Sequence, residues 1–239
     1  MAVSAAAVRT GRRTRRFYVG MAIAIAITVF LGFFRSYYLK GWYGAPELGR
    51  LLHLHGLVFT TWVLFFVSQT VLVATGRTWL HRRMGIAGAV LAALVVIVGT
   101  TVAITRLRTG ISPLPEIPAA SFFAIPFFDM VVFAILVATA IYYRRRLEVH
   151  KRLMTLSMIT LLPAPIARMS FLPLPPGPPT FFALADLFIV AMLVYDLTTR
   201  RKIHPATIWG GLLVVASQPL RLMLAGTPAW LGFARWVSG

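Results

Sequence analysis

Two histidines, His53 and His55, stand one residue apart at the start of an apolar run in the stretch LLHLHGLVF. Imidazole nitrogens bind metal ions and haem iron, so this spacing raises the question of a cofactor site. On a helix, residues two apart point about 200° from each other, so the pair cannot chelate one ion unless the first turn unwinds. His55 shares its helix stripe with Trp62 and Gln69, and we expect it to face the interior. For either histidine, the alternative is an interfacial side chain bonded to loop backbone.

Two carboxylates, Asp129 in FFDMVVF and Asp186 in ALADLFIV, also lie within apolar runs. Counting about 1.5 Å per residue places them roughly 12 Å and 9 Å from the outer ends of their runs. A charge at such depth costs about 2.5 to 3.5 kcal/mol, so each should be protonated or have a partner in the bundle. Arg168 and Arg221 are candidate partners. The alternatives are that the arginines snorkel to the surface and that the aspartates make structural hydrogen bonds between helices.

These polar residues predict a ligand pocket in the outer half of a helix bundle. Pro163 and Pro165 in LLPAPIARM strengthen this interpretation, because prolines remove backbone donors and interrupted helices often line binding sites in membrane proteins. The predicted pocket residues are His53, His55, Trp62, Gln69, Asp129, Arg168, Asp186 and Arg221, with Gln218 at the same level.

Three further histidines, His81, His150 and His204, begin apolar runs at the other side of the membrane. They are candidate ligands for a divalent metal or a b-type haem on the cytoplasmic side. The alternative is an interfacial role, because each stands among arginines or lysines that repel a metal cation and favour anionic lipid headgroups. A bis-histidine haem needs one histidine from each of two facing helices at one depth. His53 and His55 lie on a single helix and cannot hold such a haem. A haem held by His81 and His150 on the cytoplasmic side remains allowed, but both histidines would have to dip inward past their flanking cations.

The elements that position these residues are membrane-spanning helices. Of the 239 residues, 59% are hydrophobic and 13% are charged, and the mean hydropathy is +0.80, which is typical of an integral membrane protein. Short alternating strands of a barrel are absent from the sequence, so an all-α bundle is expected. Apolar runs of roughly 20 residues predict about seven transmembrane helices, near residues 17–37, 51–74, 85–105, 121–143, 152–172, 180–198 and 206–225.

The basic residues predict the orientation of the bundle. Sixteen of the 24 lysines and arginines lie in the N-terminal tail and in the loops after the second, fourth and sixth expected spans. Cytoplasmic loops retain such residues, so we expect a bacterial inner-membrane protein with its N-terminus in the cytoplasm and its C-terminus outside. This divides the chain into a basic cytoplasmic tail (1–16), a seven-helix domain (17–225) and an outer interfacial tail (226–239). The net charge of +18 then indicates binding to anionic lipid headgroups rather than to nucleic acid.

Two stretches resemble families of bacterial multi-spanning membrane proteins without an assigned activity. The first is His150 to Met169, HKRLMTLSMITLLPAPIARM, which is similar to the helix starts of these families, in which a histidine is followed by a cation, an arginine and Leu-Met. The second is the run LHLHG…TTW…SQT…GRTWLHRRMG, which is similar to another segment of the same families. One related small family with the same helix start is associated with maturation of haem-copper terminal oxidase. The resemblance covers about 55 residues and implies a respiratory assembly role as one hypothesis.

Three functions remain open from the sequence. The first is a binding or redox-associated protein whose outer pocket holds a metal, a quinone-like molecule or another small ligand. The second is a small-molecule or proton-coupled transporter that uses Asp129 and Asp186. The third is an accessory or assembly subunit that binds other subunits of a respiratory membrane complex. No hydrolase or phosphate-loop motif is present, and the absence of cysteine excludes disulfides and iron–sulfur clusters. Enzymatic activity and the identity of a cofactor stay undecided.

Overall fold

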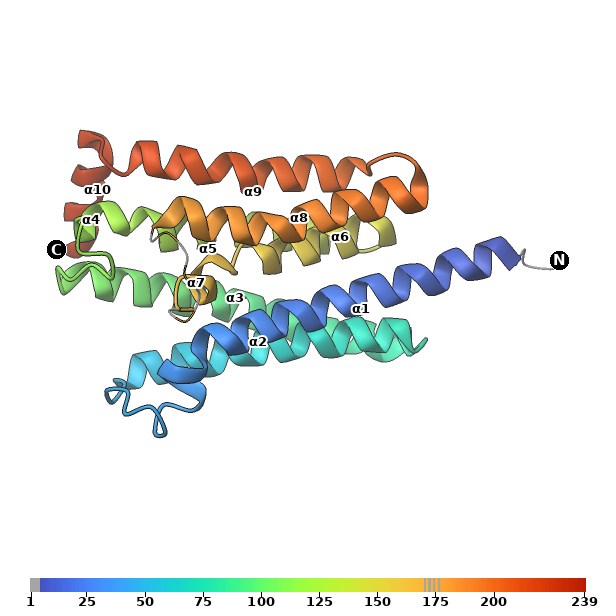
Figure 1. The fold of residues 1–239 in the computed structure, drawn as a ribbon, viewed down its shortest axis with the longest axis horizontal. Helices are drawn as coiled ribbons and strands as arrows, with labels where there is room; N and C mark the ends of the chain where they lie inside the picture. Colours follow the sequence, from blue (N-terminus) through green and yellow to red (C-terminus); the bar gives the residue numbers. More distant parts are fainter. Residues whose placement is uncertain (1–4, 170, 172, 174, 176) are drawn as a thin grey trace.

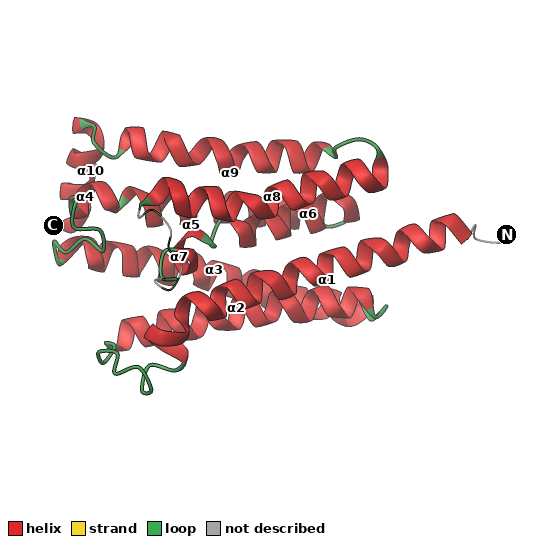
Figure 2. Ribbon diagram, in the orientation of Figure 1, coloured by secondary structure: helices red, strands yellow, loops and turns green. Residues whose placement is uncertain are grey.

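The computed structural model describes residues 5–169, 171, 173, 175 and 177–239, and across these ranges it contains helices and no strand (Figure 2). The elements in chain order are α1 (Ala5–Phe33), the π-helical turn η1 (Phe34–Tyr38), α2 (Arg50–Ala74), α3 (Thr78–Arg108), α4 (Ala119–Phe122), α5 (Ala124–Tyr142), α6 (Leu147–Ile159), α7 (Pro163–Ile166), α8 (Pro178–Arg200), α9 (Pro205–Leu224) and α10 (Pro228–Ser238).

The long helices run along one axis of the molecule, and the two termini lie at opposite ends of it (Figure 1). In the described part of the chain, six helices are long and apolar enough to cross a membrane: Gly11–Tyr38, Arg50–Ala74, Thr78–Arg108, Ala119–Tyr142, Pro178–Arg200 and Pro205–Leu224. Large apolar side chains such as Ile86 (76% exposed) and Met223 (75% exposed) point outward from the bundle, as they do in a protein surrounded by lipid. The chain is a multi-pass α-helical membrane protein.

The arginine-rich loops gather at one end of the bundle, which we call the basic end. It holds the N-terminal part of α1 and the loops 75–77, 143–146 and 201–204 that follow α2, α5 and α8. The other end, which we call the opposite end, holds the C-terminus. There α10 runs across the bundle rather than along it (Figure 1), with Trp230 buried and its indole N–H donating to the Ala120 carbonyl at 2.8 Å.

The expected span at 152–172 is not one continuous helix; residues 170 and 172 of that span lie outside the described part of the chain. α6 ends at Ile159, and after three residues a single helical turn, α7, begins at Pro163. Pro163 and Pro165 lack the backbone N–H that a continuing α-helix would need, which explains the break. The prediction of a full-length fifth helix was therefore wrong.

The half-length helix α6 is nevertheless deeply embedded in the bundle. Leu156 and Ile159 are fully buried, and the aliphatic core around them includes Leu136 of α5. Gly210 of α9 permits a close approach, because a Cβ atom at that position would lie 2.6 Å from the Leu156 side chain. α5, α6 and α9 consequently pack as one group. Apart from the polar groups on α2, each polar cluster described below includes a residue of one of these three helices.

Candidate functional site

Asp129, one of the two carboxylates in mid-span, is neutralised within the protein. It is 7% exposed on α5 and forms an ion pair with Arg221 of α9, which is 2% exposed. The Arg221 guanidinium also donates to the Ser217 carbonyl (3.1 Å), the Ser217 hydroxyl (2.8 Å) and the Ile125 carbonyl (3.3 Å). A buried charge with these partners has little capacity left for a ligand.

Asp186, the second carboxylate, accepts a hydrogen bond from the Gln218 amide at 2.9 Å. Gln218 stands three residues before Arg221 on α9, so the two aspartates attach to neighbouring positions of one helix. The space beside Asp129 and Arg221 is also lined by Thr160 at the break after α6, and it has no room for a water molecule. Asp129 and Arg221 therefore border a closed space, and Gln218, which lines the same space, links Asp186 to it.

The other residues of the expected outer pocket are not partners of that cluster. His53 is exposed and lies beside Tyr37, with ring centres 6.2 Å apart. His55 stacks on Phe59 at 4.1 Å, and its buried Nδ1 has no hydrogen-bond partner among the residues that the structure describes. Arg168 donates to a carbonyl of α7 at 2.7 Å and acts electrostatically on His55 rather than on an aspartate. Across the described ranges, no contact joins His55 to either carboxylate.

A row of unpartnered polar groups runs along α2. His55, Trp62 and Gln69 are spaced by seven residues, nearly two full turns, and share one face of the helix. Trp62 is 2% exposed and Gln69 is 8% exposed, yet the indole N–H of Trp62 and both amide atoms of Gln69 have no hydrogen-bond partner within the described part of the chain. A buried polar group without a partner costs about 1 to 3 kcal/mol. Such groups call for a partner from outside the chain, such as water, an ion or a ligand.

His81 and His150, two of the three histidines expected at the cytoplasmic side, do come together. They lie near the starts of α3 and α6 at the basic end, and their ring centres are 6.1 Å apart. The His150 Nδ1 lies 2.9 Å from the Ala140 carbonyl, a contact in which the ring nitrogen must be the donor. The His81 Nδ1 is buried and has no partner among the described residues.

His204, the third histidine, has a different task. Its Nδ1 accepts a hydrogen bond from the backbone N–H of Ala206 at 3.0 Å, which caps the first turn of α9. Burial and the nearby positive charges of Arg152 and Arg200 lower the pKa of His204, which keeps the ring neutral and able to accept this bond. A site of three or more His, Cys, Asp or Glu side chains suited to a metal ion does not occur among the described residues.

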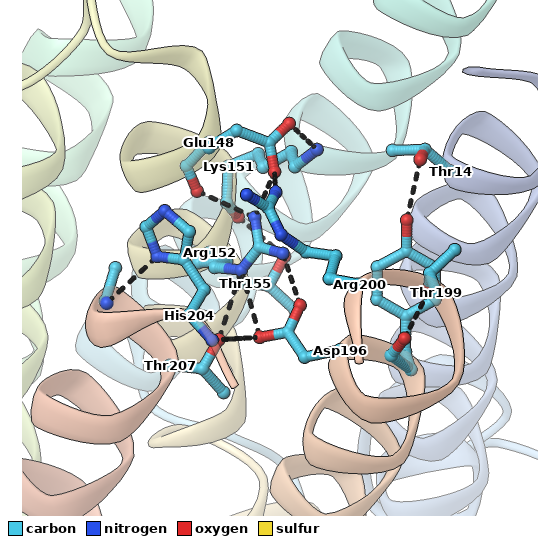
Figure 3. Close-up of polar contacts among 12 residues, drawn as sticks. Thr14, Glu148, Lys151, Arg152, Thr155, Asp196, Thr199, Arg200, His204 and Thr207 are labelled. Atoms are coloured by element: carbon cyan, nitrogen blue, oxygen red, sulfur yellow. Dashed lines mark hydrogen bonds and ion pairs between the residues drawn. The ribbon is translucent and has the colours of Figure 1, made fainter. Parts of the chain in front are cut away.

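The most extensive polar network lies at the basic end and centres on Arg152 of α6 (Figure 3). Arg152 and Asp196 of α8, 0% and 1% exposed, form an ion pair. The Arg152 Nε donates to the Thr207 hydroxyl at 3.1 Å, and that hydroxyl donates to Asp196 at 2.7 Å. The backbone N–H of His204 donates to the same carboxylate at 3.1 Å. The network therefore ties α6, α8 and the start of α9 together.

Glu148 extends this network to the surface. Its carboxylate accepts from Arg152 at 2.6 Å, from Arg200 at 2.6 Å and from Lys151 at 2.5 Å (Figure 3). Partial burial by itself raises the pKa of Glu148, but hydrogen bonds and charges of Lys151 and Arg152 outweigh it and hold the pKa below its ordinary value. The cations that follow His150 in sequence are thus occupied by carboxylates.

The sequence pattern does not distinguish Arg152 and Asp196 from the other charged residues at the helix ends. Arg152 belongs to an arginine-rich cluster that indicates orientation, and Asp196 lies at the end of its predicted span, where a charge has ready access to water. The sequence feature that could have indicated their pairing is a common depth in the membrane. Arg152 lies in the first turns of α6, and Asp196 lies in the last turns of the antiparallel α8.

The chain matches no protein-family model, no curated protein and no solved structure. The resemblance of His150–Met169 to bacterial membrane-protein families therefore remains an expectation from the sequence.

Proposed function

We propose that this membrane protein binds a metal-containing cofactor through the imidazoles of His81 and His150. The observation that carries the proposal is the 6.1 Å separation of their ring centres across two helices, α3 and α6, at one end of the bundle. Two imidazoles that bind one metal ion through nitrogens at about 2 Å place their ring centres about 5 to 6.5 Å apart, depending on the angle at the metal, and the observed separation lies in this range. His81 and His150 also come from two different helices, both of which pack on α5, and lie at the same end of the bundle.

The hydrogen bonds of the two rings support ligation. Donation from the His150 Nδ1 to the Ala140 carbonyl fixes the tautomer and leaves Nε2 with its lone pair. A hydrogen bond from the other ring nitrogen to a backbone carbonyl commonly orients histidine ligands of metals. His81 contributes a buried Nδ1 whose partner is missing from the described chain.

Much of the positive charge beside the histidines is compensated within the protein, although Arg82 acts electrostatically on His81. Lysine and arginine beside the histidines would repel a metal cation, but Lys151 is paired with Glu148, and Arg152 with Asp196. Arg83 is stacked on the Trp79 ring, with 5.1 Å from the guanidinium carbon to the ring centre.

Haem fits the donor set better than a bare ion. Two histidines leave the remaining positions of the metal to atoms from outside the protein, and a porphyrin supplies four nitrogens. We therefore place haem first and a divalent metal ion second.

Spectroscopy and metal analysis of the full-length protein in mild detergent test the proposal. After incubation with haem, or with Zn²⁺, Fe²⁺ or Cu²⁺ in a parallel series, we expect one equivalent per chain; haem gives a reduced-minus-oxidised α-band. His81→Ala and His150→Ala should each abolish stoichiometric binding. His204→Ala is the matched control, because this histidine lies at the same end but caps α9. Wild-type protein that binds neither haem nor metal, or equal binding by all variants, would refute the proposal.

The orientation of the protein in the membrane is a separate part of the proposal. We propose that the basic end faces the cytoplasm of a bacterial cell, so that the N-terminus is inside and the C-terminus outside. The concentration of arginine in the loops at this end supports the assignment. Labelling of single cysteines introduced at Arg145 and Gly239 tests it: an impermeant thiol reagent added to intact cells should modify only the second.

A proton-coupled transporter is the second candidate, and Asp186 favours it. This mid-span carboxyl has an amide partner but no ion pair among the described residues, so it is suited to gain and lose a proton. Proton flux into proteoliposomes, followed with an entrapped pH-sensitive dye, should be abolished by Asp186→Asn and retained by Asp186→Glu. Flux that persists after neutralisation of both Asp186 and Asp129 would remove this candidate.

A further inference from the structure

A lateral groove of about 580 Å³ lies between α1 and α8 at the basic end. Arg13, Arg16 and Thr198 line its outer part, and apolar side chains that include Phe17, Met21 and Val194 line the rest. Among the residues that line the groove there is no carboxylate. Its composition therefore changes from cationic to apolar along its length.

The two arginines retain most of their hydrogen-bonding capacity. Arg13 donates to the Thr198 hydroxyl at 3.3 Å, which uses one of its five N–H groups. Arg16 makes no hydrogen bond or ion pair with any part of the chain that the structure describes. Two guanidinium groups one helical turn apart form a natural receptor for a phosphate group.

The apolar wall extends from these arginines toward the middle of the membrane. Thr198 and Ala191 both line the groove and are seven residues apart on α8, which corresponds to about 10 Å of depth. Phe17 stacks on Tyr195 at 4.0 Å and closes the back of the groove. A phosphate at the arginines would thus have its hydrocarbon chain directed along an apolar surface.

We infer that this groove binds one anionic phospholipid, whose phosphate contacts Arg13 and Arg16 and whose acyl chain lies between α1 and α8. The charge of the site decides the class of lipid, because it offers two cations and no carboxylate for the positive headgroup of a zwitterionic lipid. Basic pockets between transmembrane helices recognise anionic lipids by the same chemistry. The site is independent of the histidine pair and of the proposed cofactor.

Native mass spectrometry of the detergent-solubilised full chain tests the charge of the site. Dioleoyl phosphatidylglycerol should bind with a stoichiometry of one and more tightly than dioleoyl phosphatidylcholine. Arg13→Gln/Arg16→Gln should weaken phosphatidylglycerol binding about 30-fold, from roughly fivefold per arginine. Arg12→Gln/Arg145→Gln removes the same charge from exposed positions outside the groove and should leave this binding unchanged.

A steric variant tests the location without a change in charge. Gly20 lines the groove, and a Cβ there would meet no atom within 4 Å, so Gly20→Leu adds a bulky side chain at the groove without a clash at its Cβ. It should displace the lipid, whereas Gly11→Leu, equally unobstructed on α1 but outside the groove, should not. Equal affinity for the two lipids, an equal loss in Arg12→Gln/Arg145→Gln, or wild-type binding by Gly20→Leu would each overturn the inference.

Discussion

Substitution of Asp196 by asparagine tests the buried ion pair at the basic end. Asp196 accepts two hydrogen bonds from the Arg152 guanidinium. In the neutral amide, one of the two oxygens becomes an NH2 group that cannot accept, so one bond is lost and the other no longer joins opposite charges. At about 1.5 to 3 kcal/mol for each bond to a charged group, the two bonds together are worth about 3 to 6 kcal/mol. Breaking a buried pair by removing one partner costs about 3 to 5 kcal/mol, which lies within that range. We expect a decrease of this size in the free energy of unfolding.

Unfolding of the purified protein in mixed detergent micelles, followed by far-ultraviolet circular dichroism, measures this change. Glu148→Gln is the matched control, because it removes another carboxylate from the same guanidinium. Glu148 is half-exposed, so this loss should stay below about 1 kcal/mol. Arg152→Met/Asp196→Leu removes both charges and should recover most of the loss. An effect of Asp196→Asn below about 1 kcal/mol, or a double variant less stable than Asp196→Asn, would refute the assignment of a tightly coupled buried pair.

Two further predictions concern packing and pH. Gly32→Ala should lower the free energy of unfolding by about 2 to 3 kcal/mol, because its Cβ would overlap the Pro165 carbonyl oxygen. The control Gly20→Ala, in open space, should be neutral or stabilising by up to about 1 kcal/mol. Unfolding in detergent compares the two variants, and equal effects would contradict the close approach of α1 to α7. The pKa of Glu148 is held below its ordinary value by its cationic neighbours, among them Lys151, so its contribution to stability is present at neutral pH and is lost as pH falls through the folded-state pKa. The melting temperature should therefore fall less between pH 7 and pH 3 in Glu148→Gln than in wild type, and identical profiles would exclude this contribution.

The sequence predicts the long helices well because their signal is local. Apolar runs of sufficient length specify α2, α3, α8 and α9, and a hydrophobic run needs no knowledge of its neighbours to be recognised. The fifth expected span shows the limit of this reasoning. Its composition is that of a membrane helix, but Pro163 and Pro165 remove backbone donors, and the helix ends at Ile159.

The polar contacts are less predictable because they depend on which helices become neighbours. The sequence offers Arg168 and Arg221 as partners for mid-span aspartates; in the structure Arg221 pairs with Asp129, while Arg168 bonds to backbone of its own segment. Asp196 is separated by 44 residues from Arg152, and no local pattern connects the two. The α2 stripe is a different case, because spacing by seven residues is sufficient to place Trp62 and Gln69 on one face.

The short helix α6 has a consequence for how the protein is made. Its 13 residues rise about 20 Å, less than the roughly 30 Å of the hydrocarbon core, and they include Arg152. The groups that neutralise and bind that arginine, Asp196 and Thr207, are synthesised 44 and 55 residues later. A nascent chain that has just completed α6 therefore holds a cation for which its interior partners do not yet exist. α6 can reach its final place only after α8 and the start of α9 have emerged from the ribosome, so the bundle closes late in synthesis.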